Sequence, residues 1–134
     1  MIEGEGFGSP SLAHTTEVDM GFTPAEKEEL ASHAGSRAAY VSLHTADPST
    51  TGANEATGGS PAYARKPVTF VAGSSDGVVS GTAVVFDIPA GTYTHIGLWD
   101  AVTAGVFRGG EALPSSFVAA GQDAVAVAVS VTVS

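Results

Sequence analysis

The chain has 134 residues, a length that suits one domain with a single hydrophobic core. It has no cysteine, which excludes disulfide bonds and thiolate metal sites, and its net charge of −9 disfavours binding to nucleic acid or to an anionic membrane, because both require a basic surface. Only 14% of the residues are charged, well below the roughly 25% of an ordinary soluble domain. We therefore expect neighbouring subunits to cover much of the surface.

Residues 1–22 are predicted to form an extended N-terminal arm. The arm contains Gly, Ser, Thr and acidic residues with isolated apolar side chains, and residues 1–29 hold seven acidic residues against one lysine. Such a segment cannot build a core of its own. We therefore predict that the arm lies along a neighbouring subunit, with Ile2, Phe7 and Leu12 among its contacts.

A short helix is predicted over residues 23–35. Thr23 can cap its start, Pro24 suits a first turn in which its missing amide is not needed, and Glu26 completes a capping box. Gly35 is a natural residue just past a helix, so we expect the helix to stop there. Its apolar stripe is thin, which predicts that it packs on the surface of the domain.

Residues 36–134 are predicted to be mainly β, folded as a single antiparallel β-sandwich of jelly-roll-like or immunoglobulin-like type. Short runs of alternating apolar and polar residues are separated by turn-forming residues, which is typical of this class. The predicted strands cover residues 38–45, 65–71, 77–87, 93–99, 106–112 and 124–133. A turn is expected over residues 114–122.

Two of these strands are expected to supply the core. In residues 92–100, strict alternation would place Ile96 and Leu98 on one face and Tyr93 and Trp99 on the other. The last strand alternates valine with alanine, serine or threonine. The core residues predicted from both strands are Ile96, Leu98, Trp99, Val125, Val127 and Val129.

A long loop over residues 46–61 is rich in Gly, Pro, Ser and Thr. A loop of this length in a small domain is usually functional or held by a partner. We therefore predict that it packs at an oligomer or partner contact, through Asp47, Pro48, Asn54 and Glu55.

No pattern in the chain is typical of a catalytic, cofactor or metal site. The four histidines lack metal-ligand spacing, no serine lies in a Gly-x-Ser-x-Gly elbow, and the glycines of residues 58–60 are not followed by the lysine of a phosphate loop. We therefore predict no enzyme activity, no cofactor and no metal. Arg65 and Lys66, the only basic pair, are interpreted as ordinary surface charge. Trp99 and Tyr93 leave open a sugar-stacking platform, although burial of the single tryptophan is favoured.

Two segments resemble a family of small bacteriophage tail-fibre-like and minor tail proteins. They are YVSLHTADP at residues 40–48, followed by TGANEATGGSPAYARK at residues 51–66, and PAGTYTHIGLWDA at residues 89–101. The resemblance covers residues 38–134 and implies a virion structural protein, synthesised in the cytoplasm of a bacterial host, with no catalytic residues.

The resulting hypothesis is a minor tail or tail-fibre-like protein that acts through oligomeric assembly with other tail or capsid subunits. A homo-oligomer is expected, and family habit suggests a trimer. Two alternatives stay open: a capsid decoration protein that stabilises the shell, and a module that binds carbohydrate on the host surface.

Overall fold

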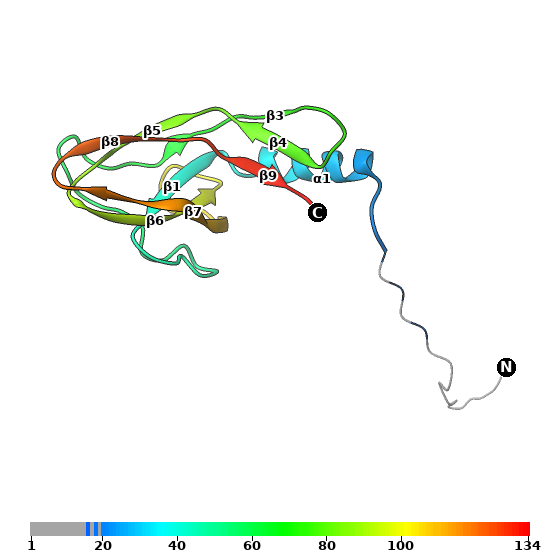
Figure 1. The fold of residues 1–134 in the computed structure, drawn as a ribbon, viewed down its shortest axis with the longest axis horizontal. Coiled ribbons are helices and arrows are strands. Elements are labelled where there is room, and N and C mark those ends of the chain that lie inside the picture. The colour runs from blue at the N-terminus through cyan, green and yellow to red at the C-terminus, as the bar shows by residue number, and fades with distance from the viewer. Residues whose placement is uncertain (1–15, 17, 19) are drawn as a thin grey trace.

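A computed structural model describes residues 16, 18 and 20–134. The predicted arm contacts Ile2, Phe7 and Leu12 lie outside the described residues. Two β-layers face each other, and one helix lies at the end of the sandwich where the chain also finishes (Figure 1). Within the described part of the chain, no helix is long and apolar enough to cross a membrane.

Helix α1 (Pro24–Ser36) begins where the sequence predicts. The Thr23 hydroxyl accepts a hydrogen bond from the Glu26 amide at 3.2 Å, which confirms the N-cap. The predicted stop at Gly35 is wrong, because the helix includes Gly35 and Ser36 and is capped by Arg37 in right-handed geometry. Gly35 instead allows close packing: a Cβ atom there would lie 3.0 Å from the Cβ of Phe70.

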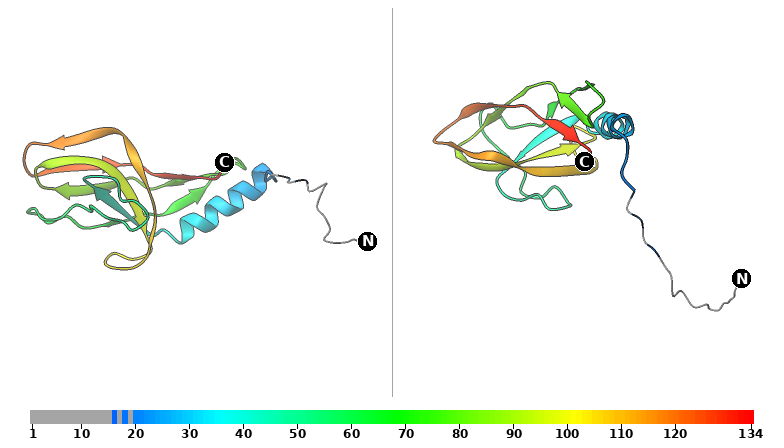
Figure 2. Two further views of the ribbon diagram at one scale, coloured as in Figure 1. Left: turned by 90° about the horizontal axis from the view of Figure 1, so that it is seen from below. Right: turned by 45° about the vertical axis from the view of Figure 1, so that its right-hand side comes forward.

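One buried carboxylate fastens α1 to the sandwich. Glu28 accepts hydrogen bonds from the amides of Gly73, Asp76 and Gly77 at 3.1, 3.3 and 3.1 Å. The helix packs against the strands that flank this turn, as Figure 2 shows. A polar contact thus replaces the wide apolar stripe that this helix lacks.

The first layer is a four-stranded antiparallel sheet in the order β2-β1-β6-β7. Its strands are β1 (Tyr40–His44), β2 (Lys66–Pro67), β6 (Gly91–Trp99) and β7 (Phe107–Ala119). The predicted turn over residues 114–122 is wrong in its first part, because β7 continues through Pro114. An edge strand tolerates proline, and the pairing of β7 with β6 skips from Ala112 to Phe117 around it.

The second layer faces the first and is bent. Its strands are β3 (Phe70–Ala72), β4 (Val78–Gly81), β5 (Val84–Ile88), β8 (Asp123–Val127) and β9 (Ser130–Thr132). They pair as β3-β4-β9 and β5-β8. The long strands predicted at 77–87 and 124–133 are therefore each interrupted, at residues 82–83 and 128–129. The interruptions lie side by side, since the Gly81 amide donates to the Val129 carbonyl at 2.7 Å.

The core lies between the two layers and is centred on Val41, Leu43, Phe86 and Ile88, all fully buried. The predicted core residues that the structure places in it or against it are Ile96, Leu98, Val125, Val127 and Val129. Val129 is buried, whereas the other four are half-buried.

The predicted strict alternation of the β6 side chains between two faces is wrong. The register with β7 shifts between Tyr93 and His95, and Tyr93 lies in the core, with Ile96 and Leu98 packed against it. Trp99 stays on the opposite face, where it is buried apart from the central cluster.

Candidate functional site

The loop over residues 46–61 covers the outer face of β1 and β6. Backbone hydrogen bonds attach the loop to the end of β1. The Thr45 amide donates to the Asn54 carbonyl and the Ala56 amide donates to the Leu43 carbonyl, both at 2.9 Å. Pro48, on the side of the loop that faces the sheet, is fully buried. As a result, Ser42 and His44 are buried although they point away from the central core.

A chain of hydrogen bonds runs beneath this loop. The Trp99 indole N–H donates to Ser42 Oγ at 2.9 Å, and Ser42 Oγ lies 2.7 Å from His44 Nε2. His44 Nδ1 lies 2.7 Å from the Ala53 carbonyl, which can only accept. The proton therefore resides on Nδ1, and Nε2 accepts from the Ser42 hydroxyl. Burial lowers the pKa of His44 and outweighs the Ala53 hydrogen bond, which acts in the opposite direction. The lowered pKa keeps the ring neutral.

Glycines let the loop approach the sheet. Gly52 has a φ of +77°, and a Cβ atom there would lie 2.3 Å from Trp99 Cζ2. On the strand below, a Cβ atom at Gly97 would lie 2.6 Å from Ser42 Oγ and 2.7 Å from the Phe107 ring. Gly52 therefore allows the loop to lie against Trp99, and Gly97 leaves room for the Ser42 and Phe107 side chains.

Arg65 connects the loop to the turn that follows β6. Its Nε and Nη2 atoms donate to the two carboxylate oxygens of Glu55 at 2.9 and 3.0 Å, while Nη1 donates to the carbonyls of Ala101 and Ala104 at 3.0 and 2.8 Å. Its guanidinium carbon lies 3.6 Å from the centroid of the Trp99 ring. Only 9% of the Arg65 side chain is exposed, so its interpretation as surface charge is wrong.

Tyr63 connects Glu55 to the core strand. Its hydroxyl donates to Glu55 Oε2 at 2.8 Å and accepts from the Leu43 amide at 3.0 Å. Burial opposes the ionisation of Glu55, but the hydrogen bonds from Arg65 and Tyr63 outweigh it and hold its pKa below its usual value. Glu55 is thus a charged, paired carboxylate.

The four predicted contact residues of the loop are brought together, and all of them help to hold it. Asn54 Nδ2 donates to the Asp47 carbonyl at 2.9 Å, and Asp47 Oδ1 accepts from the Ser49 amide at 2.8 Å. Pro48 and Glu55 face the sheet and Arg65, whereas Asp47 and Asn54 are exposed. Their role at a partner contact stays a prediction.

A hollow of about 270 Å³ opens beside Glu55, Tyr63 and Arg65, but the innermost part of the network is not accessible to a substrate. Ser42 and His44 are fully buried and hydrogen-bond to each other, so they do not form an accessible nucleophile and base. Trp99 and Tyr93 are 8% and 2% exposed and lie on opposite faces of β6, which removes the sugar-stacking platform. Among the described residues, no three His, Asp or Glu side chains gather as metal ligands would.

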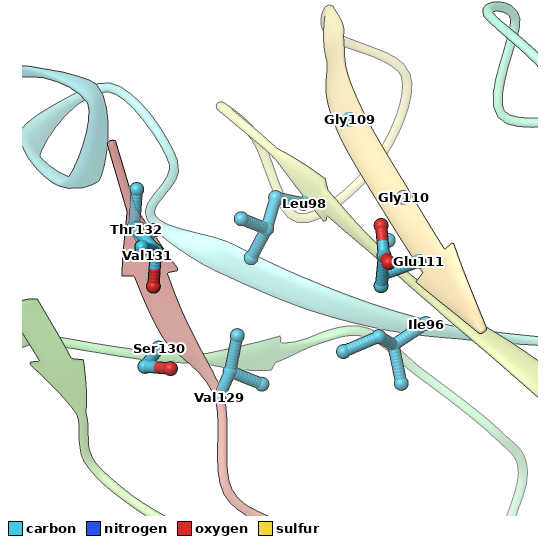
Figure 3. A pocket seen from close by; sticks show the side chains of 10 residues that line it. Ile96, Leu98, Gly109, Gly110, Glu111, Val129, Ser130, Val131 and Thr132 are labelled. Carbon is cyan, nitrogen blue, oxygen red and sulfur yellow. The ribbon is translucent and has the colours of Figure 1, made fainter. Parts of the chain in front are cut away.

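Sequence reasoning missed Ser42, His44, Tyr63 and Arg65 as parts of one network. All four lie in the segments quoted above for the family resemblance, which was the available signal. It also missed an apolar groove on one open side of the sandwich, between β7 and β9 (Figure 3). The groove has a volume of about 330 Å³, with Ile96 and Leu98 as its floor. A second hollow of about 350 Å³ continues it from Ile96 toward Phe117 and Val125.

A family model described as "Podophage GP4 fiber I protein gp80" matches residues 31–134. The match spans the second half of α1 and every strand from β1 to β9, including the loop network and the groove. The chain belongs to this family. Membership of a phage fibre family makes it a virion structural protein of the tail-fibre type and confirms the predicted resemblance. No curated protein matches the sequence.

Proposed function

We propose that the protein is a fibre subunit of a tailed phage and that it acts through oligomeric assembly on the particle. The observation that carries this proposal is the match of the fibre family to the entire sandwich. The low charge content supports it, because an isolated domain with 14% charged residues is poorly protected against association.

A structural role also suits the polar network beneath the loop. Its members satisfy one another, and the most buried of them stabilise the loop rather than face solvent. The outer side of the loop, away from the network, carries Asp47 and Asn54, which are both exposed. In the proposed assembly these two side chains contact a partner subunit, while Pro48 and Glu55 fix the shape of the loop.

The arm is the proposed attachment element. Residues 1–30 lie outside the family match, so the arm and the first turns of α1 are the part of this chain that the family does not require. Three apolar arm residues, Val18, Met20 and Phe22, are exposed in the single chain. Contact with a neighbouring subunit would remove them from water, which is a favourable change.

Two experiments on phage particles test the proposal. Labelled protein, imaged on the virion, should lie on the tail; label over the head would instead support capsid decoration. A chain lacking residues 1–21 should keep the circular dichroism and the unfolding midpoint of the full chain yet be absent from particles. Normal incorporation of that folded truncation would overturn the role of the arm.

A further inference from the structure

The groove between β7 and β9 lies where the sandwich is not closed. Both strands are edges of their sheets in the described part of the chain, and the half-buried side chains of Ile96 and Leu98 point into the space between them (Figure 3). Val129 and Val131 form the wall on the β9 side. The groove is thus an apolar slot about as long as a short strand.

Glycine in β7 explains why this slot is open. Leu98 pairs with Gly109, which has no side chain to cover it, and a Cβ atom at Gly109 would meet no heavy atom within 4 Å. Further along β7, Glu111 stands at the lip of the groove. A larger apolar residue at position 109 would have covered Leu98 from within the chain.

The β9 edge also offers backbone groups for pairing. The Val129 carbonyl accepts from Gly81, and the Val133 amide donates to the Gly77 carbonyl at 2.8 Å, so these residues direct their backbone groups toward β4. Backbone groups alternate in direction along an antiparallel strand. The amides and carbonyls of Ser130 and Thr132 therefore point to the free edge, where an added strand would bond them.

The chain itself contains a segment with the matching pattern. Val18, Met20 and Phe22, here called the arm triplet, occupy alternate positions and are 68, 73 and 54% exposed. In an extended strand they would share one face. The arm leaves the body close to β9, because a Cβ atom at Gly77 would touch both the Val133 carbonyl and Lys27 in the first turns of α1.

We propose that the arm triplet of one copy adds as an extended strand to the β9 edge of a second copy and buries its side chains on Ile96 and Leu98. This inference rests on the oligomeric assembly proposed above. The triplet is exposed in its own chain, so it does not fill its own groove. Pointing the triplet inward turns the intervening positions outward, and the acidic one at position 19 then avoids Glu111.

A disulfide cross-link tests the contact, because the native chain has no cysteine. A Met20→Cys chain is mixed under mild oxidation with a tagged Val129→Cys or Val131→Cys chain, both on the groove side of β9. At least one mixture should give a mixed disulfide dimer. The control partner is Val118→Cys, which is 70% exposed but does not line the groove. Equal cross-linking to the control, or cross-linking in neither groove mixture, would overturn the proposal.

Sedimentation of the full chain gives the second readout. The Met20→Ser/Phe22→Ser variant should need at least about tenfold more protein for half-association, whereas Val118→Ser should behave as the wild type. Association that is unchanged in the double variant overturns the docking site and leaves the proposed assembly intact. A wild-type chain that is monomeric at every concentration contradicts the assembly itself. A disulfide that forms only within a doubly substituted chain places the arm in its own groove and also overturns the inference.

Discussion

The guanidinium group of Arg65 stacks on the Trp99 ring at 3.6 Å while the same group forms a two-point ion pair with Glu55. Together with the Arg65 bonds to the Ala101 and Ala104 carbonyls, these contacts join the loop to the end of β6 and to the turn that follows it, which are distant from the loop in sequence. A cation over an indole ring is favourable, and more so where water is excluded. Arg65 therefore determines how the loop lies on the sheet.

Replacing Arg65 by lysine should lower the free energy of unfolding by about 2 kcal/mol, because an ammonium group cannot bond both Glu55 oxygens and stack on Trp99 together. Urea unfolding measures the loss. The matched control is Arg108→Lys, since Arg108 forms a 3.1 Å ion pair with Asp100 that is about a third exposed on both sides. That pair should contribute less than about 1 kcal/mol. Equal losses in the two variants would contradict the structural role of Arg65.

Gly52→Ala should detach the loop from Trp99. The new methyl group would combine a positive φ of +77° with a 2.3 Å approach to the indole ring, so we expect a loss of about 3 kcal/mol or more. Gly58→Ala separates the two effects, because its φ is +86° but no heavy atom lies within 4 Å of the added Cβ. It should cost only about 1 to 2 kcal/mol. Tryptophan emission should shift to the red in the first variant and stay unchanged in the second.

Local signals in the sequence predicted several elements well. Thr23, Pro24 and Glu26 marked the start of α1 because capping depends on neighbouring residues alone. The valines of residues 124–133 marked a buried face, and the alternation survives the break between β8 and β9 because the inward side chains continue across it. These features need no knowledge of distant parts of the chain.

The errors at Gly35 and Arg65 concern contacts between distant segments. Glycine is common at the end of a helix, but Gly35 is needed for another reason, because Phe70 packs closely against it. An arginine next to a lysine is usually an exposed charge. Arg65 is buried because Glu55, Trp99 and residues 101–104 pack around it in the folded chain. The sandwich class was thus predictable, whereas the loop network and the groove depended on how the two layers meet.

Lowering the pH below about 6.5 should destabilise the protein through His44. Burial holds its pKa in the folded state below the ordinary value of 6.5, so between the folded and the unfolded pKa the unfolded chain binds more protons. The contribution to stability is fully present above 6.5 and is lost as the pH falls toward the folded pKa, at no more than about 1.4 kcal/mol per pH unit.

Urea unfolding at pH 7.5, 6.5 and 5.5 measures this dependence. This pH range excludes the titration of Glu55, whose lowered pKa affects stability only below its ordinary value of 4.5. A His44→Gln variant should be less stable at pH 7.5 but should lose part of the pH dependence, because glutamine does not titrate. An identical pH dependence in wild type and variant would show that His44 is not responsible.

Glu28→Ala should release α1 from the sandwich, because it leaves the amides of Gly73 and Gly77 without their acceptor, whereas the Asp76 amide keeps its 2.8 Å bond to the Ser74 carbonyl. We expect a loss of about 1 to 3 kcal/mol in the free energy of unfolding, the usual cost of orphaned buried donors. Hydrogen exchange should accelerate at the Gly73 and Gly77 amides in particular. Glu29→Ala is the matched control, since its neighbouring carboxylate is exposed on the same helix and should change stability by less than about 0.5 kcal/mol. Slow exchange retained at Gly77 in the Glu28 variant would mean that the turn, not the carboxylate, holds the helix in place.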